Sequence, residues 1–160
     1  MTKAWARWLT AVLAGGTLFA WGTVLADFRR FFRAGGTLGQ VAGTTYPHPA
    51  ITPCFYGAIL FLVALTWAAT LPADPPERRR RAVRQLTGML VLGTLFAWGN
   101  FAWELYRYCQ PHEGPYLSCS GTVAANPVYT PCFVGALIYL TALVVALVGA
   151  RRRRAAPATA

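Results

Sequence analysis

The sequence predicts an all-α integral membrane protein, a bundle of four transmembrane helices made by tandem duplication of a two-helix unit. Composition is the first reason: charged residues make up 12% of the chain and hydrophobic residues 56%, whereas a soluble domain carries about 25% charged residues. The second is four uncharged stretches that can each cross a hydrocarbon core, which requires about 20 helical residues. The third is an internal repeat. A length of 160 residues allows one domain, so residues 1–160 are expected to form a single membrane domain.

The apolar stretches and the basic residues around them predict how the chain crosses the membrane. In order, the stretches are Trp8–Ala26, Pro53–Leu71, Leu86–Trp103 and Pro131–Ala150. Eleven of the 15 Lys and Arg residues precede the first stretch, separate the second from the third, or follow the fourth. Basic residues gather on the cytoplasmic side, so both termini, the basic linker 73–84 and the tail 151–160 are expected there. Loops 27–52 and 104–130 are then extracytoplasmic, and the membrane is the inner, cytoplasmic membrane of a prokaryotic cell.

Two sequence blocks occur twice, in the same order. Gly-Thr-Leu-Phe-Ala-Trp-Gly at 16–22 recurs unchanged at 93–99, and Thr-Pro-Cys-Phe at 52–55 recurs at 130–133. The two repeats extend over about 8–72 and about 85–150. Each repeat holds two spans, so both enter the membrane in the same direction and are related by a pseudo-two-fold axis along the membrane normal. Because the first span corresponds to the third, we expect it to be retained rather than removed as a signal peptide.

Residues shared by the repeats are expected to serve packing. The shared glycines are Gly16, Gly22, Gly93 and Gly99. Small residues mark helix interfaces in lipid, so these glycines are predicted to let helix backbones approach closely. Asp27 with Arg30, and Glu104 with Arg107, have the i, i+3 spacing of helical ion pairs and are expected to pair.

The four cysteines are the candidate functional residues. In both copies of Thr-Pro-Cys, Thr suits the N-cap and Pro the first helical position. This pattern places Cys54 and Cys132 in first turns at the outer membrane face, where unpaired N–H groups and the helix dipole favour a thiolate. Cys109 and Cys119 occur only in the second repeat, ten positions apart in an outer loop. They are the favoured loop disulfide, with Cys54 and Cys132 paired to each other or free.

Two hypotheses follow from these cysteines. In one, two structural disulfides brace the outer loops. In the other, a loop pair exchanges with a pair at the membrane face through mixed disulfides and passes electrons to a membrane quinone. The arrangement is similar in outline to quinone-linked disulfide-forming membrane proteins and to vitamin K epoxide reductases, whose Cys-x-x-Cys motif this sequence lacks. The repeated Thr-Pro-Cys also resembles the Pro-Cys helix starts of thiol-reductant transporters of the cytochrome c biogenesis kind, which have more helices.

Other functions find less support in the sequence. His48 and His112 lie in the outer loops, but neither has the tight spacing of a metal ligand, so no metal site is expected. The net charge of +10 comes from basic runs beside apolar spans, which indicates contact with anionic lipid and not nucleic acid. The central parts of the spans hold no ionisable residue, which argues against a pump or ion channel.

We therefore expect a non-catalytic membrane subunit or scaffold whose disulfide-braced loops dock an envelope or membrane protein, or a second copy of the chain. The first alternative is an envelope thiol–disulfide oxidoreductase using Cys54 and Cys132 with Cys109 and Cys119, with a quinone as the possible cofactor. The second alternative is a component of small-solute or metal transport.

Overall fold

The computed structural model describes residues 3–39, 47–71, 75–111 and 116–154. Its long helices are α1 (Lys3–Arg33), α2 (Pro53–Thr70), α3 (Pro76–Cys109) and α4 (Pro131–Arg154), and the short 3₁₀ helices η1 (Pro49–Ile51) and η2 (Pro127–Tyr129) precede α2 and α4. All four long helices are long and apolar enough to span a membrane. The all-helical class and the four predicted spans are therefore confirmed.

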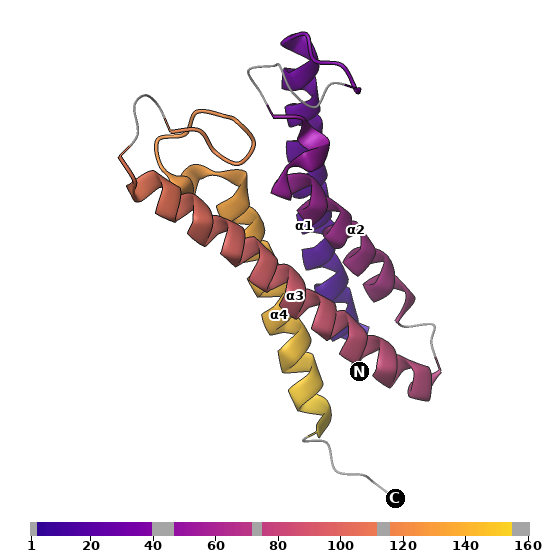
Figure 1. Cartoon of the computed structure of the whole chain (residues 1–160). Helices are drawn as coiled ribbons and strands as arrows, with labels where there is room; N and C mark the ends of the chain where they lie inside the picture. Colours follow the sequence, from indigo (N-terminus) through magenta and orange to yellow (C-terminus); the bar gives the residue numbers. More distant parts are fainter. Residues whose placement is uncertain (1–2, 40–46, 72–74, 112–115, 155–160) are drawn as a thin grey trace, which may run out of the picture.

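The helices form a bundle in which each has two main neighbours. Helix α1 packs against α2 and α4, and α3 packs against α4 and α2. Figure 1 shows the N-terminus and the start of α3 at one end of the bundle, and the end of α3 and the starts of α2 and α4 at the other. We call the latter the loop end. Toward it, the pair α1 and α2 diverges from the pair α3 and α4 (Figure 1).

The first and third helices are longer than the apolar stretches predict. Helix α1 continues to Arg33 and α3 to Cys109, so the starts of both expected loops are helical. The reason is that Asp27 and Glu104, the first charged residues after each stretch, are only 5% and 3% exposed and have partners inside the protein. Most of the expected linker 73–84 is also helical, because Pro76 provides a favourable first helical residue.

Stacked rings and two hydrogen bonds to carbonyl groups hold the centre of the bundle together. The rings of Phe61 on α2 and Tyr139 on α4 stack with centroids 3.9 Å apart. The Tyr139 hydroxyl donates a hydrogen bond to the Gly57 carbonyl at 3.0 Å. Near the other end, the Trp5 indole N–H donates to the Val145 carbonyl at 2.7 Å, which joins α1 to α4. The stacked rings fix the middle of α2 against the first half of α4.

Apolar side chains also cover the outside of the bundle. Leu18 and Leu92, in the middle of α1 and α3, are 77% and 69% exposed. A soluble monomer rarely exposes contiguous apolar surface on this scale. Lipid covers such a surface in a membrane protein, which agrees with the four candidate spans.

Two of the four repeated glycines lie at helix interfaces, as expected, but side chains and not helix backbones approach them. A Cβ atom at Gly16 would lie 2.6 Å from the Phe61 ring, and one at Gly93 would lie 2.6 Å from the Tyr139 ring. Both glycines therefore make room for the central pair of aromatic residues. The expectation is wrong for Gly22 and Gly99, where an added Cβ meets nothing within 4 Å.

This difference predicts opposite effects for two substitutions in α3. Gly93→Ala pushes the methyl group into the Tyr139 ring, and we expect the free energy of unfolding to fall by about 1–3 kcal/mol, as for other overpacked cores. Gly99→Ala is the matched control, because it meets open space and gains helix propensity of up to about 1 kcal/mol. Unfolding in mixed micelles, followed by tryptophan fluorescence, measures both. Equal stability of the two variants would contradict the assigned packing.

Candidate functional site

Helices α2 and α4 begin alike at the loop end, and these starts position two of the cysteines. Pro53 and Pro131 are the first residues of α2 and α4, as predicted, so Cys54 and Cys132 are the second. Thr52 occupies the N-cap position, but its side chain makes no capping hydrogen bond. Its hydroxyl donates instead to the Pro49 carbonyl at 2.7 Å, which ties the helix start to η1.

His48 has a structural role in this region. Its Nδ1 atom accepts a hydrogen bond from the Ala50 N–H at 3.2 Å and so caps η1. Its ring lies edge-on to Phe31, with centroids 5.0 Å apart. Asn126 caps η2 in the same way, accepting from the Val128 N–H at 2.9 Å. His112, the other histidine considered for a metal, lies outside the described residues.

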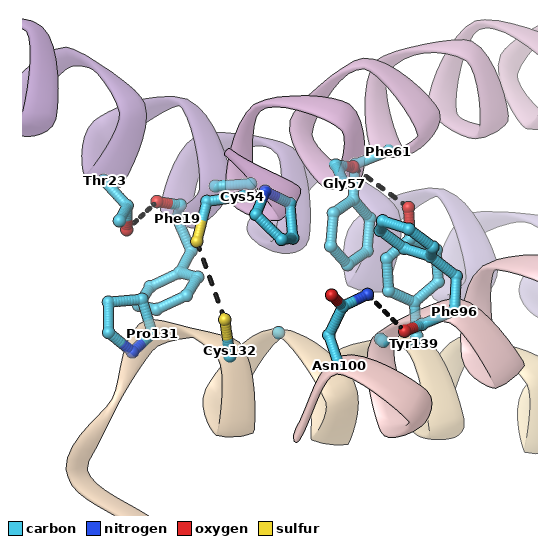
Figure 2. Close-up of a pocket in the computed structure, with 14 residues that line it drawn as sticks. Phe19, Thr23, Cys54, Gly57, Phe61, Phe96, Asn100, Pro131, Cys132 and Tyr139 are labelled. Atoms are coloured by element: carbon cyan, nitrogen blue, oxygen red, sulfur yellow. Dashed lines mark hydrogen bonds between the residues drawn. The ribbon is translucent and has the colours of Figure 1, made fainter. Parts of the chain in front are cut away.

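Three of the four cysteines meet at the loop end. Cys119 and Cys132 form a disulfide. The sulfur of the free Cys54 lies 3.4 Å from that of Cys119 and 3.7 Å from that of Cys132. Figure 2 shows Cys54 and Cys132 pointing toward one another from α2 and α4. We call these residues the three-cysteine cluster.

The favoured pairing of Cys109 with Cys119 is wrong. Cys109 is a free, exposed residue at the end of α3. The N–H of Cys119 donates to the carboxylate of Glu104. Glu104 precedes Cys109 by five residues on α3, which corresponds to about 7.5 Å along the helix axis. Cys119 is therefore held more than one turn deeper than Cys109, beside the start of α4.

A tight turn in the loop after α3 presents Cys119 to the cluster. The Gly121 N–H donates to the Ser118 carbonyl at 2.8 Å, and the Ser118 N–H donates to the Thr122 carbonyl at 2.9 Å. Gly121 has a φ of 73°, a conformation that glycine adopts without steric cost. Cys119 occupies the second position of this turn, so its side chain is set by the turn and by Glu104 together.

Glu104 belongs to the site and does not form the ion pair with Arg107 that its spacing predicts. Its carboxylate accepts hydrogen bonds from the Cys119 N–H and, at 3.1 Å, from the Thr130 hydroxyl. It therefore connects α3 to both the loop and the start of α4. The predicted ion pair of Asp27 with Arg30 is confirmed, and it is the only salt bridge among the described residues. The sequence feature that points to Glu104 is its position as an acidic residue directly after the apolar stretch Leu86–Trp103.

The start of α2 and its surroundings have opposite effects on a thiolate at Cys54. The helix N-terminus favours a thiolate at Cys54, but this residue is half-buried and lies within electrostatic range of the Asp27 and Glu104 carboxylates. Their negative charge opposes a thiolate. Burial raises the pKa of Tyr116 to about 12, and the charge of Glu104 adds to this effect. The cysteine cluster is therefore placed in an electronegative part of the bundle.

An apolar cleft adjoins the cluster, between the four helices (Figure 2). Its lining residues include Cys54 and Cys132, but Cys119 is not among them. Aromatic rings dominate its walls, contributed by Phe19, Phe61, Phe96 and Tyr139. The Asn100 amide also lines the cleft and donates one hydrogen bond to the Phe96 carbonyl at 2.7 Å. The cleft has a volume of about 50 Å³, the space of a few water molecules.

Thiol labelling tests this assignment of the cysteines directly. We expect two labelled sites per chain in non-reducing conditions, with Cys109 labelled rapidly because it is exposed and Cys54 more slowly because it is half-buried. Mass spectrometry of the labelled protein should find Cys119 and Cys132 joined. In the control variant Cys109→Ser, only the slow label is left. A rapid label on Cys119 would contradict the structure.

Comparisons with protein-family models, curated proteins and solved structures found no match for this chain. What the site can do therefore follows from its own geometry. A disulfide, a third thiol within 4 Å of both its sulfurs and an adjoining apolar cleft form a set suited to sulfur redox chemistry.

Proposed function

We propose that the protein is a membrane thiol–disulfide oxidoreductase, which takes electrons from a dithiol at the loop end and passes them to a quinone in the membrane. The observation that carries this proposal is the free Cys54 thiol, 3.4 and 3.7 Å from the two sulfurs of the Cys119–Cys132 disulfide. A structural disulfide alone has no need of a third cysteine in contact with it.

The first step oxidises the dithiol of a partner protein. One partner thiolate attacks the Cys119 sulfur, which forms a mixed disulfide and releases the Cys132 thiolate. The second partner thiolate then attacks the partner's sulfur of the mixed disulfide and releases the Cys119 thiolate. The partner becomes a disulfide, and its two protons pass to Cys119 and Cys132. Cys119 suits the role of the attacked sulfur, because the loop carries it outside the cleft.

The second step returns the electrons to the membrane. Cys54 and Cys132 line the cleft and their sulfurs are 3.7 Å apart. They form a disulfide by giving two electrons and two protons to the quinone, which becomes a quinol. The Cys119 thiolate then attacks Cys132, restoring the Cys119–Cys132 disulfide and releasing Cys54, which takes up the proton from Cys119. The attacking sulfur must approach along the bond that breaks, so Cys119 has to move from the position that the turn and Glu104 give it.

The cleft suits an apolar acceptor in chemistry, and side-chain movement has to widen it. Its rings provide stacking surfaces, and the Asn100 amide has a second hydrogen with which to bind a quinone carbonyl. At about 50 Å³, it admits a quinone ring only after a wall turns outward. Phe96, which is 39% exposed, is the wall residue with the freedom to do so.

A docking subunit is the second candidate function. The disulfide between Cys119 and Cys132 fastens the loop after α3 to the start of α4. The loop also exposes large apolar side chains, among them Val123 and Tyr129, which a partner protein can cover. This function uses the disulfide as a brace and assigns no chemistry to Cys54.

The membrane orientation and the duplication belong to the same proposal. The uneven distribution of Lys and Arg supports cytoplasmic termini and an extracytoplasmic loop end in the inner membrane, where partner dithiols are oxidised. The identical seven-residue blocks and the two Thr-Pro-Cys-Phe blocks support tandem duplication, with the two repeats related by a pseudo-two-fold axis. Duplication accounts for one thiol on each side of the cleft, at Cys54 and Cys132.

Turnover by the purified protein tests the proposal. The protein in lipid nanodiscs is mixed with a reduced two-cysteine peptide and a short-tailed quinone, and quinone reduction is followed by absorbance. We expect a rate proportional to protein concentration, with one quinone reduced for each peptide disulfide formed. A rate no greater than that of peptide and quinone alone would reject the oxidoreductase and favour the docking subunit.

A further inference from the structure

When its disulfide is reduced, the three-cysteine cluster holds three thiol groups close together. The sulfur atoms of Cys54, Cys119 and Cys132 all lie within 4.8 Å of one another. Cys54 lies beside the disulfide, nearly equidistant from both sulfurs, and not at either end of the bond. Three sulfurs placed around a common centre are the donor set of a three-coordinate metal ion.

The charges around the cluster favour a cation. The Asp27 and Glu104 carboxylates are both buried and act electrostatically on Cys54. One oxygen of Asp27 is buried without a hydrogen-bond partner. In the reduced state, up to three thiolates would therefore share a poorly hydrated region with two acidic groups. A bound cation relieves this repulsion, to which Asp27 contributes less because Arg30 pairs with it.

We propose that the reduced three-cysteine cluster binds one soft monovalent metal ion of the Cu(I) class. Thiolate sulfur selects soft ions such as Cu(I), and the harder divalent ions prefer oxygen ligands. Zinc usually takes four protein ligands in a closed site, and no fourth histidine, cysteine or carboxylate joins the group in the part of the chain that the structure describes. The donors come from α2, α4 and the loop between α3 and α4, so the ion would link these three segments.

The site exists only in the reduced protein, which makes binding dependent on redox state. A dithiol reduces the Cys119–Cys132 disulfide to two thiols and becomes a disulfide itself. Cu(I) then displaces the protons of the coordinating thiols, with no change in the oxidation state of copper or sulfur. The bound ion occupies the sulfurs that have to rejoin. This inference rests on the proposed function in one respect, because the catalytic cycle supplies the reduced state.

Titration of the reduced protein with Cu(I) alone tests the site. The protein is reduced with a phosphine under anaerobic conditions, cleared of reductant, and titrated against a chromogenic Cu(I) chelator. We expect one Cu(I) per chain, and X-ray absorption should show sulfur ligands only. We expect no binding at the cluster in the oxidised protein. Cys54→Ser and Cys132→Ser should each weaken binding by at least about 10-fold, while Cys109→Ser should bind as the parent does.

The outcomes separate this site from the redox cycle. Equal binding by Cys54→Ser and the parent, or equal binding by oxidised and reduced protein, would overturn the metal site. Thermal unfolding in metal-free buffer shows whether each serine variant is folded, and two independent variants guard against the loss of one. The titration contains neither quinone nor peptide, so the metal site can fail while turnover persists, and turnover can fail while one Cu(I) still binds.

Discussion

Replacing Cys54 with serine should abolish steady-state turnover and preserve a single oxidation of substrate dithiol. The Cys119–Cys132 disulfide still forms in this variant, so one equivalent of dithiol is oxidised. The return of electrons through Cys54 and Cys132 is lost, because a hydroxyl group cannot form a disulfide. We expect the steady-state rate to fall by at least about 100-fold, as for the loss of an essential nucleophile.

Rapid mixing with limiting peptide and excess quinone separates the two phases. The parent should continue to reduce quinone until the peptide is consumed, whereas Cys54→Ser should oxidise one peptide per chain and stop. Cys109→Ser is the matched control, since Cys109 is exposed and outside the cluster, and it should turn over normally. Undiminished turnover by Cys54→Ser would remove the third cysteine from the mechanism.

Replacing Glu104 with alanine should give the largest loss of stability among single substitutions at the loop end. The Cys119 N–H loses its acceptor, whereas the Thr130 hydroxyl keeps the Pro127 carbonyl, which lies 2.7 Å away. A buried donor left without a partner costs about 1–3 kcal/mol, so we expect the free energy of unfolding to fall by about 1–3 kcal/mol. Glu104→Gln keeps one carbonyl oxygen and should recover part of this loss.

Asp27→Ala provides the matched control for Glu104. Asp27 is buried near the end of α1, but its partner is Arg30 on the same helix, and a helical ion pair contributes only about 0.2–0.5 kcal/mol. Hydrogen exchange should show faster exchange of the Cys119 amide in Glu104→Ala and no change there in Asp27→Ala. Equal losses of stability would mean that Glu104 does not hold the loop.

The parts of the fold that depend on local sequence could be predicted. Hydropathy located all four spans, because lipid requires a continuous apolar helix. Thr-Pro-Cys located the starts of α2 and α4, because proline is favoured at the first helical position. Hydropathy alone ends both segments too early, at Ala26 and Trp103, whereas the i, i+3 spacing of Asp27 and Arg30 already indicates that the helix continues. A hydropathy pattern stops at the first charged residue, but Asp27 and Glu104 are buried with partners and the helices continue past them.

The connections between distant segments could not be predicted in this way. Sequence spacing favours a disulfide between Cys109 and Cys119. In the structure, Cys109 lies at the end of α3, and the hydrogen bond from Cys119 to Glu104 holds Cys119 more than one helical turn away, beside Cys132. The meeting of Cys54 with the other two sulfurs depends on how α2 packs against α4, through Phe61 and Tyr139. The same limit applies to the glycines. Gly93 and Gly99 belong to one block, but only Gly93 faces a neighbouring helix.

The positions of the three sulfurs along the chain also bear on biosynthesis. Cys119 and Cys132 are 13 residues apart, so an α3–α4 hairpin inserted alone can close its own crosslink. Cys54 is 65 residues from Cys119 and belongs to the earlier hairpin, which joins the cluster only when the two halves dock. Two separately expressed halves, divided between α2 and α3, would each lack the complete cluster. Recovery of turnover on their co-expression would therefore show that the two halves have docked and completed the cluster.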